Sequence, residues 1–254
     1  MLFYWFLKFV AIGPWATLVF RPQAEGMENV PRSGAAILAS NHLSAADWVF
    51  MPLQLRRRVT FLAKAEYFTG RGVKGFLQRA FFSGAGQVPI DRSSASAAED
   101  AIRTGARILR DGKLLGIYPE GTRSPDGRLY RGKIGVARMA LEVGVPVVPV
   151  AMTYRRRNIP LIGRHLPRVC IQFGRPLDFS RYEGLAGDRF VERSITDEIM
   201  YEVMTLSGQE YVDVYGAHVK KSMDASGVSA SEAVSRLQPP ASEAADRAPE
   251  ALAG

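Results

Sequence analysis

His42 and Asp47 are two residues whose types and spacing would allow them to share a proton, and both follow an apolar stretch of the chain. A neutral imidazole is the natural general base near pH 7, and a neighbouring carboxylate can fix its tautomer and orientation. An aspartate in the first turn of a helix that begins after His42 could reach back to the imidazole. The alternative is structural, because Ser44 and Asp47 resemble a capping box, in which Asp47 only caps the helix and His42 is an ordinary polar residue.

A second group of polar residues lies in the segment YPEGTRS at positions 118–124, which follows another apolar run. Gly121 allows close approach to the backbone, and Thr122 can donate a hydrogen bond. Arg123 can hold a phosphate through two parallel hydrogen bonds. The turn could equally be structural, with Arg123 paired to Glu120, and the sequence leaves both interpretations open.

Two further segments are weaker candidates for a functional site, and each includes a run of apolar residues. The segment GQVPIDR at positions 86–92 places Arg92 in a loop after a short strand, although Asp91 and Arg92 are also typical of a solvated edge. The segment VPVVPV at positions 145–150 contains two prolines, which indicate an edge strand or an irregular strand. It would line an apolar groove or, as the simpler interpretation, belong to the core.

These residues need a scaffold that brings their loops together, and apolar runs alternate with helical patterns along the chain. The expected strands are Ala35–Ala39, Val59–Ala63, Gln87–Ile90, Leu114–Tyr118, Val145–Met152 and Val169–Phe173. The expected helices are Ala97–Arg110, Gly132–Val143 and Asp188–Leu206. The alternation predicts an α/β fold with a mixed, largely parallel sheet flanked by helices. In such folds functional groups collect on loops at the carboxyl ends of the strands.

The two ends of the chain differ from this body. The first twenty residues carry one charge, Lys8, and Gly13-Pro14 interrupts them. Because proline breaks helices and aromatic residues favour membrane interfaces, we expect a broken hydrophobic segment lying in one leaflet, with a buried core helix as the alternative. From Ser222 the chain is rich in Ala, Ser, Glu and Pro and should be disordered. The predicted organisation is a membrane-associated segment 1–20, a domain 21–221 and a tail 222–254.

Composition and charge narrow the choice of partners. The 254 residues are 47% hydrophobic and 23% charged, which excludes a collagen-like or fully disordered chain, and the single Cys170 allows no intrachain disulfide. A formal net charge of +8 favours an anionic membrane, a phosphorylated substrate or nucleic acid. Nucleic acid is a minority interpretation, since zinc-finger spacings and interleaved aromatic and basic residues are missing. The three histidines do not cluster, so no metal site is predicted. The oligomeric state stays open.

Taken together and in order, four motifs resemble those of the glycerolipid acyltransferases that transfer a fatty acyl group to lysophosphatidate. The motifs are Asn41-His42 with Asp47, Gly86 with Ile90-Asp91-Arg92, Pro119–Ser124, and Val145–Pro149. The segment Phe61–Phe68, with Lys64, resembles the family's basic segment, and Lys133 begins the element after the third motif. The resemblance covers about residues 20–180. Within the family, the runs Phe61–Gly75 and Gly86–Gly132 resemble the actinobacterial type.

The resemblance implies acyl transfer without a bound cofactor. His42 would deprotonate the free hydroxyl of a lysophospholipid acceptor, Asp47 would orient His42, and the alkoxide would attack the thioester of an acyl-CoA or acyl-carrier protein. The product would be phosphatidate. The residues expected to bind substrate, mostly through the acceptor phosphate, are Lys64, Arg92, Glu120, Gly121, Thr122, Arg123 and Lys133.

The resemblance and the charge together imply that anionic membrane lipid is a partner. The expected location is the cytoplasmic face of the plasma membrane, in a peripheral or monotopic arrangement. Two alternatives remain at this point. The first is the same chemistry on glycerol 3-phosphate or a glycosylated phosphoinositide. The second is a non-catalytic basic membrane protein, which would have no need of His42.

Overall fold

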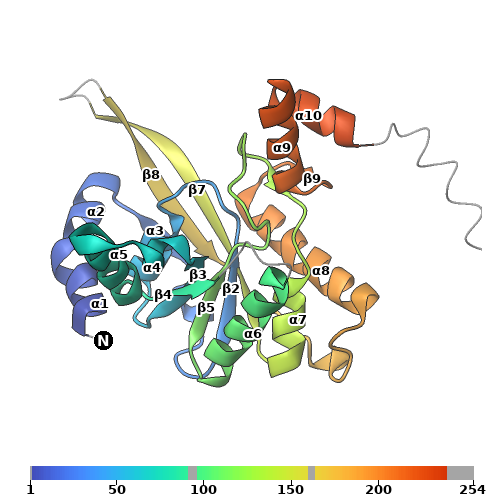
Figure 1. Cartoon of the computed structure of the whole chain (residues 1–254), viewed down its shortest axis with the longest axis horizontal. Coiled ribbons are helices and arrows are strands. Elements are labelled where there is room, and N and C mark those ends of the chain that lie inside the picture. Colours follow the sequence, from blue (N-terminus) through green and yellow to red (C-terminus); the bar gives the residue numbers. More distant parts are fainter. Residues whose placement is uncertain (1, 91–95, 160–163, 239–254) are drawn as a thin grey trace, which may run out of the picture.

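A seven-stranded sheet forms the centre of the computed structural model, which describes residues 2–90, 96–159 and 164–238 (Figure 1). The strand order is β1-β8-β7-β2-β5-β3-β4, and every neighbouring pair is parallel except β7 and β8. The strands are β1 (Gln23–Glu25), β2 (Ala36–Ser40), β3 (Val59–Lys64), β4 (Gln87–Ile90), β5 (Leu114–Ile117), β7 (Val147–Ile159) and β8 (Arg164–Phe173). The predicted mixed, largely parallel sheet is confirmed.

Helices cover both faces of this sheet (Figure 1). On one face lie α2 (Gly13–Phe20) and α3 (Asp47–Gln54), and on the other lie α6 (Ala97–Arg110), α7 (Gly135–Val143) and α8 (Arg189–Ser207). Strand β2 contributes side chains to the cores on both faces of the sheet, because successive side chains of a strand point to opposite faces. Leu38 packs in the core beneath α3, while Ile37 and Ala39 pack beneath α6, α7 and α8. All five residues of β2 are buried, as expected for a central parallel strand.

The predicted helices are found with small changes at their ends. Residues Ala97–Arg110 form α6 with the expected bounds. The helix expected from Gly132 begins at Gly135, since the Lys133 N–H donates to the Pro119 carbonyl instead of joining a helix. Asp188 lies just before α8 and caps it, because its carboxylate accepts the N–H groups of the second and third helical residues.

The prolines of the segment 145–150 do not mark an edge. Strand β7 lies inside the sheet between β2 and β8, and Val147, Val148 and Val150 are fully buried. The core interpretation is therefore confirmed and the edge interpretation is wrong. Pro149 fits because the pairing of β7 with β8 begins only at Val150, so the missing N–H lies where that ladder has ended.

The first twenty residues form a broken helix, as expected. Helix α1 (Leu2–Phe6) continues into a π-helical turn (Leu7–Ala11), and α2 begins after the break at Ile12. Gly13 is required there, since an added Cβ would lie 1.7 Å from the carbonyl oxygen of Lys8. The interruption thus falls where Gly13-Pro14 predicted it.

Lys8 ties this segment to the domain. Its ammonium group is buried and donates to the carbonyl oxygens of Pro52 and Leu55 at the end of α3. Nearby, α4 (Glu66–Thr69) and α5 (Gly72–Gly84) lie beside the N-terminal helices (Figure 1). Short 3-10 helices cover Met27–Asn29 and Ser180–Tyr182.

The prediction of a disordered tail is wrong for residues 222–237. Helices α9 (Gly216–Ser226) and α10 (Ala230–Leu237) occupy this region, so the expected boundary after residue 221 falls inside α9. Their buried residues form a small core with two residues of the second, two-stranded sheet of β6 (Leu129–Tyr130) and β9 (Tyr211–Val212). The members of this core are Tyr130, Val212, Val219, Ala230, Ala233 and Val234. Small apolar residues at helical spacing were enough to bury a face, which composition alone does not reveal. Residues 239–254 lie outside the described part.

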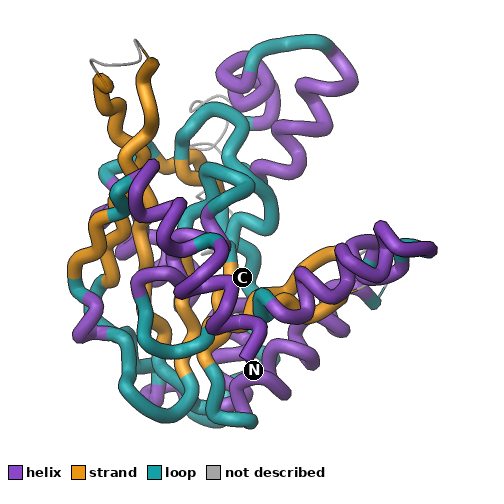
Figure 2. Tube along the Cα trace, turned by 90° about the vertical axis from the view of Figure 1, so that its left-hand side faces the viewer, coloured by secondary structure: helices purple, strands orange, loops and turns teal. Residues whose placement is uncertain are grey.

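Seen from the side, the β7–β8 hairpin and the pair α9–α10 both extend beyond the carboxyl edge of the parallel strands (Figure 2). The loops that leave β2 and β5 emerge at this same edge. The first and third sequence motifs therefore lie at the edge of the sheet from which β7 with β8 and α9 with α10 extend (Figure 2).

Candidate active site

The loops after β2 and β5 meet because the two strands are parallel neighbours. The N–H of His42 donates to Glu120 Oε1 at 3.0 Å, and the N–H of Ser124 donates to the His42 carbonyl at 2.8 Å. Both backbone groups of His42, its N–H and its carbonyl, are thus hydrogen-bonded to the segment 118–124. The expectation that these motifs share one edge of the sheet is met by direct contact.

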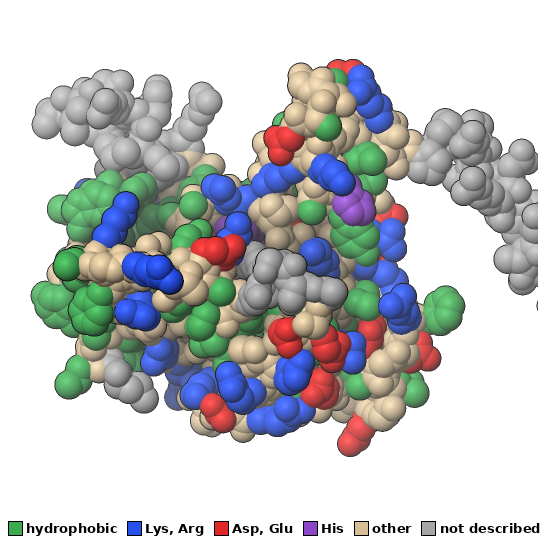
Figure 3. Space-filling view, viewed as in Figure 1, with side chains coloured by type: hydrophobic (Ala, Val, Ile, Leu, Met, Phe, Trp, Pro, Cys, Tyr) green, Lys and Arg blue, Asp and Glu red, His purple; other side chains and the backbone are tan. Residues whose placement is uncertain are grey.

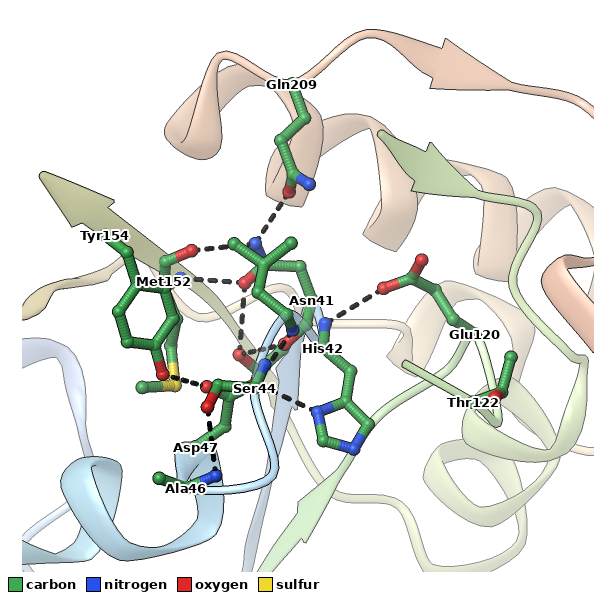
Figure 4. A network of polar contacts seen from close by, with 12 residues as sticks. Asn41, His42, Ser44, Ala46, Asp47, Glu120, Thr122, Met152, Tyr154 and Gln209 are labelled. Atoms are coloured by element: carbon green, nitrogen blue, oxygen red, sulfur yellow. Dashed lines mark hydrogen bonds and ion pairs between the residues drawn. The ribbon is translucent and has the colours of Figure 1, made fainter. Parts of the chain in front are cut away.

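His42 and Asp47 form a hydrogen-bonded pair (Figure 4). The distance from His42 Nδ1 to Asp47 Oδ2 is 2.9 Å, and the side chain of His42 is 18% exposed while that of Asp47 is fully buried. Because an ionised carboxylate only accepts hydrogen bonds, Nδ1 carries the hydrogen and Nε2 is the basic nitrogen of the neutral ring. This arrangement can accept a proton from a hydroxyl group placed beside Nε2.

Asp47 also organises the loop before α3. Its Oδ2 atom accepts the N–H groups of Leu43 at 2.8 Å and Ser44 at 2.9 Å. The pairing with His42 is thus found, whereas the capping box is formed only in part. Asp47 accepts the Ser44 N–H, but α3 begins at Asp47 and no side chain of the described residues caps its N-terminus. The four-residue spacer between His42 and Asp47 forms a tight loop around that carboxylate, which explains the spacing.

Two tyrosines complete the surroundings of the pair. Tyr154 on β7 donates its hydroxyl hydrogen to Asp47 Oδ1, and burial together with Asp47 raises the pKa of Tyr154, so the donor keeps its proton. The ring of Tyr118 stacks on that of His42 with 4.0 Å between centroids and 13° between planes. Sequence reasoning missed both roles. Tyr118 belonged to a motif already singled out, whereas no local signal connects Tyr154 with Asp47.

Asn41 is a further residue whose contacts the sequence did not reveal. Its side chain donates to the carbonyl of Met152 and accepts the N–H of the same residue, at 2.9 and 2.7 Å. It also donates to Gln209 Oε1 at 2.6 Å, and Gln209 in turn donates to the Gly127 carbonyl. Asn41 therefore fixes the end of β2 to β7 and to the chain after α8 (Figure 4).

Glu120 is used within the protein. The residue is 1% exposed, and its two carboxylate oxygens accept the N–H groups of His42 and Tyr130 at 3.0 Å each. Burial raises the pKa of Glu120 to about 7, against the lowering effect of these two hydrogen bonds. These contacts are those of a positioning residue, and the substrate-binding role expected from the sequence stays a prediction.

Basic side chains gather around the same loop. Arg123 and Lys133 are exposed and form no ion pair within the described ranges, so the pairing of Arg123 with Glu120 is not found. Lys133 lies against Gly121, where an added Cβ would be 3.2 Å from its Nζ atom. Thr122 accepts a hydrogen bond from Lys220 Nζ at 3.0 Å. Gly121 has a φ of +70°, a conformation that glycine adopts without strain.

The remaining predicted residues lie elsewhere or are not described. Lys64 ends β3 at the carboxyl edge of the sheet and is exposed. Arg92 falls within residues 91–95, outside the described part. Throughout the described residues, no three His, Cys, Asp or Glu side chains lie together as a metal site would require.

The sequence is similar to known proteins over the part that carries this site. A family model described as Acyltransferase matches residues 21–153. The chloroplastic 1-acyl-sn-glycerol-3-phosphate acyltransferase of Arabidopsis thaliana is 34% identical over 151 residues, which cover 58% of this chain and 41% of that protein. The Bacillus subtilis 1-acyl-sn-glycerol-3-phosphate acyltransferase is 29% identical over 126 residues, or 49% and 58% of the two chains. These relatives do not test the actinobacterial resemblance, which stays a prediction.

Among solved structures, the 1-acyl-sn-glycerophosphate acyltransferase from Thermotoga maritima is 23% identical, with a TM-score of 0.48 over 79% of this chain and 93% of that chain. The chain spans about half the length of the curated relatives it matches. The match to the family model contains His42, Asp47 and the whole loop 118–124. It extends over more than half of the residues, and this chain belongs to the Acyltransferase family.

Proposed function

We propose that this protein transfers a fatty acyl group from acyl-CoA or acyl-carrier protein to the free hydroxyl of 1-acyl-glycerol-3-phosphate and so forms phosphatidate. The observation that carries the proposal is the His42–Asp47 pair at the carboxyl edge of the sheet, beside a loop surrounded by basic side chains. The choice of acceptor is supported by the relatives described above, which are 1-acyl-sn-glycerol-3-phosphate acyltransferases.

The reaction follows from the orientation of His42. Nε2 takes the proton of the acceptor hydroxyl as its oxygen attacks the thioester carbonyl carbon. Collapse of the tetrahedral intermediate breaks the C–S bond, and the imidazolium returns the proton to the leaving thiolate. Asp47 stabilises the imidazolium through Nδ1. General-base catalysis of this kind contributes roughly 10²–10⁴-fold. No acyl-enzyme forms, since neither Ser44 nor Cys170 serves as a nucleophile.

The acceptor phosphate would be bound by Arg123 and Lys133, with Lys64 at the end of β3. Arg92, which lies outside the described residues, is expected to contribute as the sequence predicts. Thr122 and the backbone at Gly121 would add hydrogen bonds. A guanidinium group suits this task because its planar donors match two phosphate oxygens. In this proposal, binding of the phosphate positions the glycerol so that its free hydroxyl lies beside His42 Nε2.

The proposed location is the cytoplasmic face of the plasma membrane. The helical segment Leu2–Phe20 is apolar enough to cross a membrane by length and composition, with a mean hydropathy of 1.5, and only 22% of it is buried. It exposes large apolar side chains, and α5 exposes three more. These residues are Leu2, Phe3, Phe6, Phe9, Val10, Trp15 and Leu18 on the segment and Val73, Phe76 and Leu77 on α5. We interpret this surface, which we call the apolar face, as lying in the membrane interface.

The experiment that tests the reaction is acyl transfer by the purified full-length protein from palmitoyl-CoA. Lysophosphatidate and glycerol 3-phosphate are offered separately. The wild type should form phosphatidate from lysophosphatidate, and His42→Ala should lose at least about 100-fold in rate because it lacks the base. His218→Ala, a change at an exposed histidine on α9, is the matched control and should keep wild-type activity. Equal rates for wild type and His42→Ala would refute the mechanism. Product from glycerol 3-phosphate alone would refute the acceptor.

A further inference from the structure

Lys220 reaches the active-site loop from a helix far away in the sequence. It lies in α9, and its Nζ atom donates to Thr122 Oγ1 at 3.0 Å across 98 positions of the chain. We propose that Lys220 is a phosphate-binding residue of the active site, and that it recognises the phosphomonoester of the acceptor. This inference rests on the proposed function, because it assigns a further residue to the same substrate.

The position of Lys220 is fixed by the packing of α9. The neighbouring Val219 is fully buried in the core that α9 and α10 share with Tyr130 and Val212. The first residue of α9, Gly216, lies against the loop, since an added Cβ would be 3.3 Å from both Thr122 Cγ2 and Tyr130 Cγ. The helix is therefore docked on the segment that contains Thr122, and Lys220 is held at its edge rather than free in solvent.

The basic side chains around the loop 118–124 are not neutralised by acidic side chains of the described residues. Lys133 lies against Gly121, Lys220 donates to Thr122, and Arg123 is the next residue of the same loop. None of the three has an ion-pair partner in the part of the chain that is described. Glu120, the acid of this loop, is buried and accepts two backbone N–H groups. Burial and then the charge of Arg123 lower the pKa of Lys220, whereas Glu120 and Asp224 raise it. Two exposed cations and the half-buried Lys220 around one loop, with no acid paired to them, indicate that an anion binds there.

Basic side chains gather beneath α9 on the face shown in Figure 3. The loop they surround is bonded directly to His42, through Glu120 and through the N–H of Ser124. In 1-acyl-glycerol-3-phosphate only a few bonds separate the reacting hydroxyl from the phosphate. In acyl-CoA the long pantetheine arm separates the thioester from the phosphates. A phosphate site this close to the base therefore suits the acceptor rather than the donor, and a dianionic phosphomonoester suits three converging cations.

The test compares Lys220→Gln with Lys221→Gln in the full-length protein. Both changes remove one positive charge from α9, but Lys221 is exposed and has no contact with Thr122. Glutamine at position 220 keeps a polar donor but removes the charge, and Lys220→Arg keeps the charge. Lys220→Gln should raise the KM for lysophosphatidate about tenfold and leave kcat and the KM for palmitoyl-CoA unchanged, because a hydrogen bond to a charged group is lost. Lys221→Gln should match the wild type, and Lys220→Arg should restore most of the affinity.

Three outcomes would overturn the inference. One is an unchanged KM for lysophosphatidate in Lys220→Gln, and another is a rise in the KM for palmitoyl-CoA instead. The third is an equal loss in Lys220→Arg, which would show that the lysine shape matters and its charge does not.

A binding measurement separates this inference from the proposed function. Calorimetric titration of each variant with glycerol 3-phosphate reads the phosphate site without turnover. If the wild type binds this probe and Lys220→Gln binds it about tenfold more weakly while no phosphatidate is formed, the phosphate site stands and the acceptor assignment fails. If the wild type makes phosphatidate and the two glutamine variants bind the probe equally, the function stands and the role of Lys220 is refuted.

Discussion

At the scale of single residues, Asp47 orients both the His42 imidazole and the loop that precedes α3. Its Oδ2 atom accepts from His42 Nδ1 and from two backbone N–H groups, so the loop and the imidazole are oriented together. Tyr154 occupies the other oxygen. A buried carboxylate with this many donors stays in one position, which fixes the direction of His42 Nε2. Preorganisation of this kind lowers the cost of reaching the transition state.

Glu120 makes stability depend on pH. Burial raises its pKa to about 7 from about 4.5, so between these values the folded protein holds a proton that the unfolded chain has lost. The free energy of unfolding should therefore fall as the pH rises from about 4.5 to about 7, by up to about 3 kcal/mol, and the contribution should level off above pH 7.

The check is urea unfolding of the wild type and Glu120→Gln at intervals across this pH window. The substitution removes the titrating group, so the fall should be smaller in the variant by this amount. It also replaces one acceptor oxygen with an amide and lowers stability at every pH, which does not alter the slope. Parallel curves for the two proteins would contradict the prediction.

At the scale of elements, the contact between α6 and α7 depends on one glycine. An added Cβ at Gly105 would lie 2.2 Å from the Sδ atom of Met139 and 3.2 Å from Leu115 Cδ2. Met139 is 1% exposed and Leu115 is fully buried, so neither side chain has free space to move into. The two helices pack closely here, and their buried side chains form the core that covers one face of β2 and β5.

Gly105→Ala should therefore lower the free energy of unfolding by about 1–3 kcal/mol through overpacking. Gly135→Ala is the matched control in the partner helix, since its Cβ would meet only Ile102 at 3.6 Å. This control should be neutral or stabilising by up to about 1 kcal/mol, because alanine is the better helix former. Chemical denaturation measures both. Equal effects of the two substitutions would show that α6 and α7 are not packed as closely as described.

At the scale of the whole molecule, exposed large apolar side chains are concentrated on one side of the protein. The apolar face carries many of them, whereas Phe190 at the start of α8 is 87% exposed on the other side of the molecule (Figure 1). The apolar face combines the N-terminal segment with α5, where Phe76 is 60% exposed. Aromatic side chains of this size account for much of the affinity of an interfacial helix.

Phe76→Asp should weaken binding to vesicles of mixed phosphatidylglycerol and phosphatidylcholine by about tenfold or more. The expected size follows from about 1.5–3 kcal/mol for burying such a ring, with the cost of placing a charge in the interface in addition. Phe190→Asp introduces the same change on the opposite side and should leave the bound fraction as in the wild type. Sedimentation with vesicles measures both proteins. Equal loss in the two variants would reject the apolar face as the membrane-binding surface.

Much of this protein follows from patterns that are local in the chain. The periods of apolar residues predicted the strands β2, β3, β4, β5, β7 and β8 and the helices α6, α7 and α8, because each period reports which side chains of one element are buried. The short strands β6 and β9 were not predicted. Their alternation predicted a largely parallel sheet. His42 and Asp47 are only five positions apart, so their spacing made the pair one of two local interpretations, and the resemblance of the four motifs favoured it.

Other features depend on segments that meet only when the whole chain packs. Tyr154 is 107 positions from Asp47, Gln209 is 168 positions from Asn41, and Lys220 is 98 positions from Thr122. These contacts depend on the strand order and on the docking of α9, which no local period encodes. The helices beyond residue 222 are the clearest case. Their small, polar composition is typical of a tail, and they are ordered because Tyr130 and Val212 offer an apolar surface on which their few buried side chains pack.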